Sequence, residues 1–184
     1  ADNTATGSQA LANTTTGTNN TAVGRSALQL NTTASNNTAV GYQSLLANTT
    51  GANNTAVGYL ALDANTTAAN NTAVGRDSLG ANTTGAQNTA VGLTAGAGIT
   101  TGSYNQAFGY QSMNTGPTTG SYNTAYGAQS AQSITSGANN VAIGHQALGA
   151  NTTGAGNTAL GAYSLDTNTT GEHNTAVGYN ALIA

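Results

Sequence analysis

The chain has very little charge, and this shortage excludes several classes of function. Only two residues are basic, Arg25 and Arg76, and charged residues make up 4% of the sequence, against roughly 25% in an ordinary globular domain. Nucleic-acid binding and polybasic attachment to a membrane surface both need clusters of Lys and Arg. We therefore expect no nucleic-acid partner, and we expect no attachment of this kind to lipid.

Cysteine is absent, so the sequence has no disulfide framework and cysteine usage says nothing about redox compartment. No apolar run approaches the ~20 residues of a membrane helix, so we expect no membrane insertion. The sequence shows no signal peptide, although its start, ADNTATG, would suit a mature end left after cleavage. Polar low-complexity composition typically means disorder when net charge is high. Here the net charge is −3 and apolar residues recur regularly, so we expect order.

What the chain does contain is one phrase, NNTAVG or a close variant, repeated along its whole length. The glycine that closes each phrase serves as an anchor, and successive anchors are 17 residues apart with one interval of 18, which contains Pro117. A short fixed period of this kind indicates a solenoid. We expect one repeat domain over residues 1–184, with the anchors Gly7, Gly24, Gly41, Gly58, Gly75, Gly92, Gly109, Gly127, Gly144, Gly161 and Gly178.

Each coil is expected to consist of strand, glycine turn, strand and Asn-Thr-Thr turn. In residues 54–57 the Thr and Val positions alternate with Asn and Ala, a strand pattern of period two. Residues 59–62 are expected to form a second short strand, and residues 65–67 a turn. The sequence therefore predicts an all-β fold, a parallel β-solenoid or β-roll of about eleven 17-residue coils. At ~4.8 Å per rung these make a rod of ~50 Å.

Stacking in register places each residue on its counterpart in the next coil. One coil has only two bulky apolar residues, the one before the anchor and the Leu four after it, so a coil cannot fold alone. Gly96 and Ala131 replace that Leu, so we expect less apolar side-chain volume at this position in the middle of the chain. An Asn stands four positions before every anchor, which we interpret as a structural ladder rather than a ligand-binding row. These residues are Asn3, Asn20, Asn37, Asn54, Asn71, Asn88, Asn105, Asn123, Asn140, Asn157 and Asn174.

Asn-Thr-Thr turns also form N-x-[ST] sequons at nearly the same corner of the coil, and we expect this row to be the more exposed candidate for glycosylation. Sugars there would supply solubility that charge does not. The candidates are Asn13, Asn31, Asn48, Asn65, Asn82, Asn151 and Asn168. Further sequons begin at Asn19, Asn36, Asn53 and Asn70.

No group of residues has the pattern of an active site, so we expect no catalysis, cofactor or metal. His145 and His173 occupy different repeat positions, without metal-ligand spacing. Asp63 and Asp166 share a position six coils apart, ~29 Å by the rung spacing, too far for paired acid-base chemistry. Tyrosines after the anchor, such as Tyr42, are expected to face outward, where they stack on sugars or pack at an interface.

The segment Asn140-Val141-Ala142-Ile143-Gly144 resembles the NSVAIG-type repeat of trimeric autotransporter adhesin heads, and the longer phrase at residues 54–70 is similar to repeats in tail-fibre-like surface proteins. This resemblance implies left-handed β-rolls, three chains to a rod, adhesion, and a place outside the cell or on a virion surface. The adhesin repeats are about 14 residues long, against 17 here, and we recognise no stalk, anchor or chaperone domain within residues 1–184.

We therefore expect a structural subunit of an extracellular fibre or shaft, adhesive through surface glycans or a receptor, and associating with itself. Placing the end of one copy against the start of another leaves 13 residues between anchors by the sequence, close enough to 17 for head-to-tail stacking; alternatively, the chain is a piece of a longer rod. Rows of Thr keep an ice-binding solenoid as an alternative. A carbohydrate-active β-helix enzyme is a further alternative, but the chain lacks the clustered carboxylates that it would need.

Overall fold

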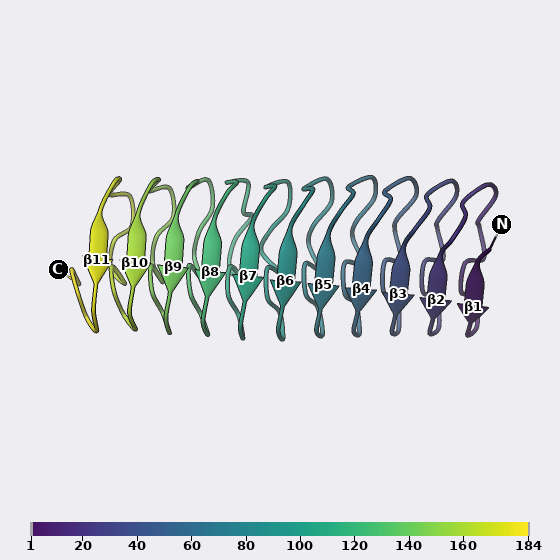
Figure 1. The fold of residues 1–184 in the computed structure, drawn as a ribbon, viewed down its shortest axis with the longest axis horizontal. Helices are drawn as coiled ribbons and strands as arrows, with labels where there is room; N and C mark the ends of the chain where they lie inside the picture. The colour runs from purple at the N-terminus through teal and green to yellow at the C-terminus, as the bar shows by residue number, and fades with distance from the viewer. Residues whose placement is uncertain (1, 184) are drawn as a thin grey trace.

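A computed structural model describes residues 2–183 as a parallel β-solenoid (Figure 1). Eleven three-residue strands form one sheet, in which consecutive strands are hydrogen-bonded neighbours. The predicted all-β, parallel solenoid is thus confirmed. The strands are β1 (Thr4–Thr6), β2 (Thr21–Val23), β3 (Thr38–Val40), β4 (Thr55–Val57), β5 (Thr72–Val74), β6 (Thr89–Val91), β7 (Gln106–Phe108), β8 (Thr124–Tyr126), β9 (Val141–Ile143), β10 (Thr158–Leu160) and β11 (Thr175–Val177).

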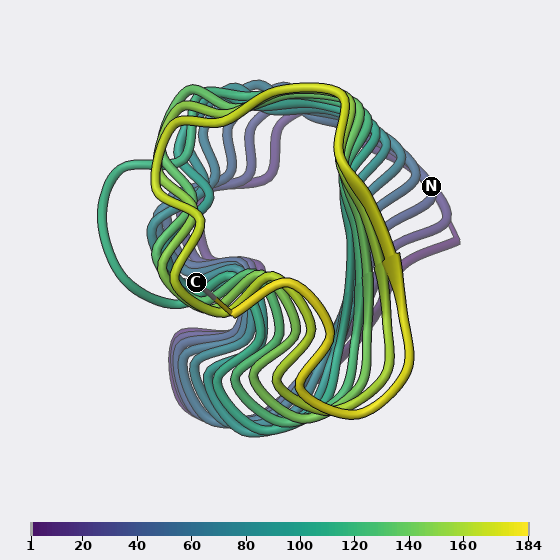
Figure 2. The ribbon, with the colours of Figure 1, turned by 90° about the vertical axis from the view of Figure 1, so that its left-hand side faces the viewer.

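The register of the sheet follows the sequence period. Thr55 pairs with Thr72 and Ala56 with Ala73, each one coil further on, and the coils share a similar outline, each slightly displaced from the last, when viewed along the rod (Figure 2). The 18-residue interval keeps this register, because Gln106 still pairs with Thr124. Its extra residue is absorbed at the exposed Pro117, in the coil where a single teal loop projects beyond the common outline in Figure 2.

The prediction of a second strand after the anchor is wrong. Residues at the second and fourth positions after the anchor, such as Leu60 and Leu62, have φ angles of 54° and 55°. An extended strand needs strongly negative φ, so these left-handed residues turn the chain where a strand was expected. Their amides still bond to neighbouring coils: Leu60 N–H donates backward to the Tyr42 carbonyl and Leu62 N–H forward to the Ser78 carbonyl, each at 3.0 Å.

The anchor glycines are required by the close stacking of the coils. Gly144 has a φ of 131°, a conformation that residues with side chains rarely adopt. A Cβ atom at this position would lie 2.6 Å from the carbonyl carbon of Gly161 and 2.7 Å from its oxygen. Any side chain would therefore strike the backbone of the next coil, which explains why the anchor never varies along the chain.

The core is narrower than the sequence suggests. Leu62 and Ala56 are completely buried, whereas Val57 is 37% exposed. The strand alternation turns Ala, together with Asn, toward the inside and turns Thr and Val outward. Of the two bulky apolar residues per coil, only the Leu is therefore in the core, and the small Ala lets the strand lie close to the opposite wall.

Two coils fill the core differently. Where Gly96 replaces the Leu, Ile99 stands in place of the Asn of the Asn-Thr-Thr turn, and both are fully buried or nearly so. A Cβ atom on Gly96 would lie 3.2 Å from the Ile99 Cδ1 atom, so the Ile side chain occupies the space that Leu fills in other coils. Ala131 and Ile134 form the same combination. The core of these two coils therefore does not lack apolar volume, because an Ile at the position of the turn Asn supplies what the missing Leu would fill.

This compensation predicts strong coupling between Gly96→Leu and Ile99→Asn. Gly96→Leu alone overpacks the core against Ile99, and Ile99→Asn alone leaves a void, so each is expected to lower the free energy of unfolding by about 1–3 kcal/mol. The double variant reproduces the Leu79 and Asn82 combination of the preceding coil and is expected to recover most of the loss. A double-mutant cycle measured by urea unfolding tests this; additive losses would contradict it.

Candidate functional site

The Asn residues before the strands form a buried ladder along the sheet. The backbone N–H of Asn71 donates to Asn54 Oδ1 at 2.9 Å, and Asn71 Oδ1 accepts from the backbone N–H of Asn88 at 2.9 Å. The Asn71 side-chain amide donates to the Gly85 carbonyl at 3.0 Å. The column is buried from Asn20 to Asn157. Each amide is thus satisfied inside the rod by its neighbours, as expected of a structural ladder.

The Asn-Thr-Thr asparagines form a second ladder that the sequence analysis did not foresee. Asn65 Nδ2 donates to Asn48 Oδ1 at 2.9 Å and to the Ala68 carbonyl at 3.0 Å. The Asn54 side chain from the first ladder donates to the same Ala68 carbonyl at 2.9 Å. The two ladders therefore meet at one carbonyl per coil and enclose one side of the core.

This second ladder corrects the expectation that the Asn-Thr-Thr row is the more exposed one. The side chains of five of the candidates are completely buried: Asn31, Asn48, Asn65, Asn82 and Asn151. Asn13 is exposed because it stands one position early, so that Asn31 meets Thr14 instead. Asn168 is half-buried and donates to the Gly171 carbonyl at 3.0 Å. A glycan is carried on Nδ2, the atom that these residues use inside the coil, so the folded coil has no room for one at the buried positions.

A signal in the sequence could have revealed this. In two of the three middle coils the corresponding position is Ile, at Ile99 and Ile134, and a bulky apolar replacement marks a position as interior. The interruption also has a cost that the structure shows. Asn82 Oδ1, which faces the coil of Ile99, is buried and makes no hydrogen bond within residues 2–183, because Ile has no amide to donate to it.

The column after the anchor faces outward, and in coils two to five it holds both of the chain's cations. The Tyr42 and Tyr59 rings stack with centroids 5.3 Å apart and planes 12° apart. The Arg25 guanidinium lies 5.9 Å from the Tyr42 centroid, and that of Arg76 lies 5.8 Å from the Tyr59 centroid. The four side chains thus form one cation–π stack along the rod. The faces of both rings are occupied within this stack, so it presents ring edges and hydroxyls outward.

The carboxylates are spread along the rod, and Asp77 lies close enough to Asp63 to affect its pKa. Burial raises the pKa of the Asp63 carboxyl, and the negative charge of Asp77 raises it further. Burial also raises the pKa of the Asp166 carboxyl, while the nearby His145 opposes part of that shift. The two aspartates belong to the coils of β4 and β10, so the structure does not bring them together.

Within residues 2–183, no three His, Asp or Glu side chains gather where they could hold a metal ion, and the surface has no pocket. In the same residues no helix is long and apolar enough to cross a membrane. Comparison with protein-family models, curated proteins and solved structures finds no match to this chain.

The ladder geometry predicts that Asn71→Ala destabilises the rod. The substitution leaves the Asn88 N–H without its acceptor inside the core and removes a donor from the Gly85 carbonyl. The free energy of unfolding is expected to fall by about 1–3 kcal/mol, the cost of one unpaired buried group, because the Gly85 carbonyl keeps its bond from Asn82 Nδ2.

The neighbouring Asn70 provides the matched control. Asn70 is exposed with a φ of 63°, a conformation that Gly tolerates, and Gly156 stands at the same position in a later coil. Asn70→Gly is expected to change stability by less than ~1 kcal/mol. Chemical denaturation followed by circular dichroism compares the two variants. Equal losses of unfolding free energy would contradict a stabilising role of the Asn ladder.

Proposed function

We propose that this chain is a non-catalytic structural rod, the shaft of an extracellular or surface fibre with an adhesive role. The observation that carries the proposal is the unbroken register of the sheet: eleven strands pair in order, from β1 to β11, without a gap or a second layer. A fold of this kind grows only in length, and its stability is a sum of contacts between neighbouring coils. Such a molecule is suited to spanning distance.

The bonds between coils support this mechanical role. In addition to the sheet and the Asn ladders, the hydroxyl of the first Thr donates to a carbonyl of the next coil in five of the seven Asn-Thr-Thr turns. For Thr49 the acceptor is the Thr66 carbonyl at 3.0 Å, and Thr66 repeats the bond to Thr83 at 3.2 Å. Hydrogen bonds around the whole coil therefore run along the rod axis, the direction in which a shaft is loaded.

Self-association is part of this proposal. Within residues 2–183, β1 and β11 each have one neighbouring strand, and a strand edge that stays unpaired is a template for another chain. We propose that copies of the chain associate with one another, end to end or side by side as a trimer. Any glycan on the rod would be carried by the exposed sequons at Asn13, Asn19, Asn36, Asn53 and Asn70, rather than by the buried ladder.

Electron microscopy and mass measurement of the purified chain test the proposal. We expect rods of ~50 Å per chain, from eleven rungs at ~4.8 Å, that join end to end into filaments or associate as trimers. Thr175→Pro removes an edge N–H of β11 and is expected to shorten end-to-end filaments while single rods still form; Thr175→Ala is the control. Monodisperse single chains of 17.9 kDa at every concentration would overturn the fibre.

Ice binding is a second candidate, favoured by the outer face of the sheet. The strand threonines stand in a column at the rung spacing, and within residues 2–183 the hydroxyl of Thr55 makes no intramolecular hydrogen bond, unlike that of Thr66. Free hydroxyls beside the Val methyl groups can order water. The column is interrupted by Gln106 in β7 and Val141 in β9, which ranks this function second.

Thermal hysteresis of the purified chain decides the matter. If the strand face orders ice, hysteresis is measurable, and Thr55→Lys reduces it several-fold because a long charged side chain breaks the column. Thr67→Lys, at an exposed turn position, is expected to leave it unchanged. Freezing without hysteresis removes this candidate.

A further inference from the structure

The aromatic residues are concentrated in one part of an otherwise uniform rod. The chain has eight Tyr and one Phe, and five of these nine lie in the coils of β7 and β8, between residues 104 and 126. At the positions of Tyr104 and Tyr122 other coils carry mainly Asn, and at those of Phe108 and Tyr126 mainly Val, whereas the position of Tyr110 holds Tyr in three other coils. A repeat protein has no need of this departure for folding, because neighbouring coils fold with the ordinary residues.

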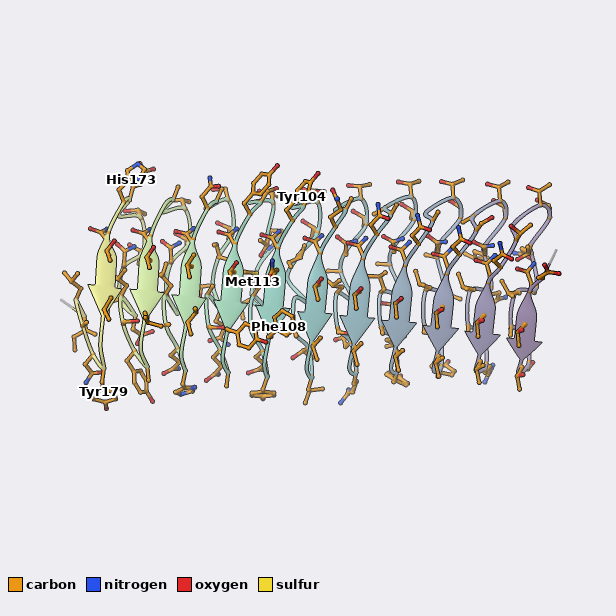
Figure 3. All side chains as sticks on the ribbon, viewed as in Figure 1. Tyr104, Phe108, Met113, His173 and Tyr179 are labelled. Carbon is orange, nitrogen blue, oxygen red and sulfur yellow. The ribbon has the colours of Figure 1, made fainter. Side chains whose placement is uncertain are left out.

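These side chains form two stacked pairs at opposite ends of β7 and β8. Tyr104 and Tyr122 stack with centroids 4.8 Å apart and planes 10° apart, just before the strands. Phe108 and Tyr126 stack at 4.5 Å and 19° at the strand ends. Tyr104 lies at one end of β7 and Phe108 at the other (Figure 3). We call these four residues, with Gln106 and Tyr110, the aromatic patch.

The aromatic patch is exposed and rigid. Tyr104, Tyr122 and Tyr126 are 45%, 58% and 52% exposed. Stacking fixes the ring orientations in advance, so little conformational entropy remains to be lost on binding. On either side of the Phe108–Tyr126 pair stand the shorter side chains of Val91 and Ile143. The ring of Tyr126 therefore extends beyond the side chain of Ile143 and offers a free face.

The polar groups of the patch are neutral. The exposed Gln106 places an amide between the two pairs, and the tyrosine hydroxyls add donors and acceptors at the rim. From residue 78 to residue 144 the sequence contains no Asp, Glu, Lys, Arg or His. A ligand for this surface is therefore matched in apolar faces and hydroxyl groups, not in charge.

The size of the patch distinguishes a sugar chain from a protein partner. Two rungs at ~4.8 Å give a width of ~10 Å, and the six steps from residue 104 to residue 110, at up to ~3.3 Å each, give a length of at most ~20 Å, so the specialised surface covers at most ~200 Å². A stable protein interface needs ~800 Å² on each side. The patch is at most about a quarter of that, which fits a short run of sugar units.

We propose that the aromatic patch binds an uncharged polysaccharide. Sugar rings place their C–H faces on the free aromatic faces, where Tyr combines an apolar body with a polar rim, and their hydroxyls bond to the Gln106 amide and the Tyr104 and Tyr122 hydroxyls. This inference names the ligand class of the adhesive role proposed above and rests on that role, but it does not depend on how the rods assemble.

The test replaces the patch by the residues of ordinary coils. The variant Tyr104→Asn, Phe108→Val, Tyr122→Asn, Tyr126→Val uses residues that neighbouring coils hold at the same positions, so the fold is retained. The control variant, Tyr42→Ala with Tyr59→Ala, removes two exposed tyrosines outside the patch at a position where Ala128 and Ala162 also occur. Circular dichroism and electron microscopy establish that all three proteins form the same rods.

Binding is measured by pull-down on insoluble cellulose and chitin and by affinity electrophoresis in galactomannan, with alginate as the acidic comparison. We expect the unmodified chain and the control variant to bind at least one neutral polymer, and the patch variant to bind it at least tenfold more weakly. Retention only on alginate, retention unchanged in the patch variant, or no retention on any neutral polymer overturns the proposal. A dimer that the patch variant abolishes, without polymer binding, assigns the patch to self-association instead. If the rods form normally but bind no polymer, the proposed role as a structural rod stands and only the proposed polysaccharide binding is refuted.

Discussion

The structure depends on one constraint: every residue has its counterpart in the next coil at a spacing of ~4.8 Å. A residue type is therefore acceptable only if it can stack on itself. Asn meets this condition because its side-chain Oδ1 accepts the backbone N–H of the Asn in the next coil while its Nδ2 donates to a backbone carbonyl, as in the series Asn54, Asn71 and Asn88. Gly meets it where the carbonyl of the next coil leaves no space for a Cβ atom. A charged side chain would face its own sign at each step, which gives a physical reason for the 4% charge.

The same constraint decides how much could be read from the sequence. The period, the anchors and the first Asn ladder are visible as residues that never change, and each has the predicted place in the fold. The second strand could not be predicted from composition, because Leu62 favours no positive φ by itself and adopts 55° only to close a 17-residue coil. The inward direction of Ala56 was also hidden, since alternation shows that two faces differ but not which one is inside. The burial of Asn65 was missed because its sequon suggested a surface role for a residue that forms a ladder.

On the surface, stacking turns single side chains into columns with joint properties. Tyr42 and Tyr59 lie face to face with each other and with the flanking arginines, so that the only two cations are held by aromatic rings rather than by carboxylates. The pair of Tyr104 and Tyr122 lies between coils that carry Gln87 and Asn139 at this position, and within residues 2–183 no arginine stacks on it. Identical residue types thus differ in chemistry according to what the adjacent coil supplies.

Departures from the repeat therefore fall into two physical kinds. In the core a departure must be compensated within its own coil, as Ile99 compensates for Gly96, because a void or a clash would be felt by both neighbouring coils. On the outer face no compensation is required, and none accompanies Phe108 or Tyr126, whose neighbours Val91 and Ile143 keep their ordinary size. Folding explains the first kind completely and the second not at all. The coils of the rod are otherwise alike, so folding does not account for the uncompensated aromatic residues on the surface. We attribute these residues to the ligand recognition proposed above.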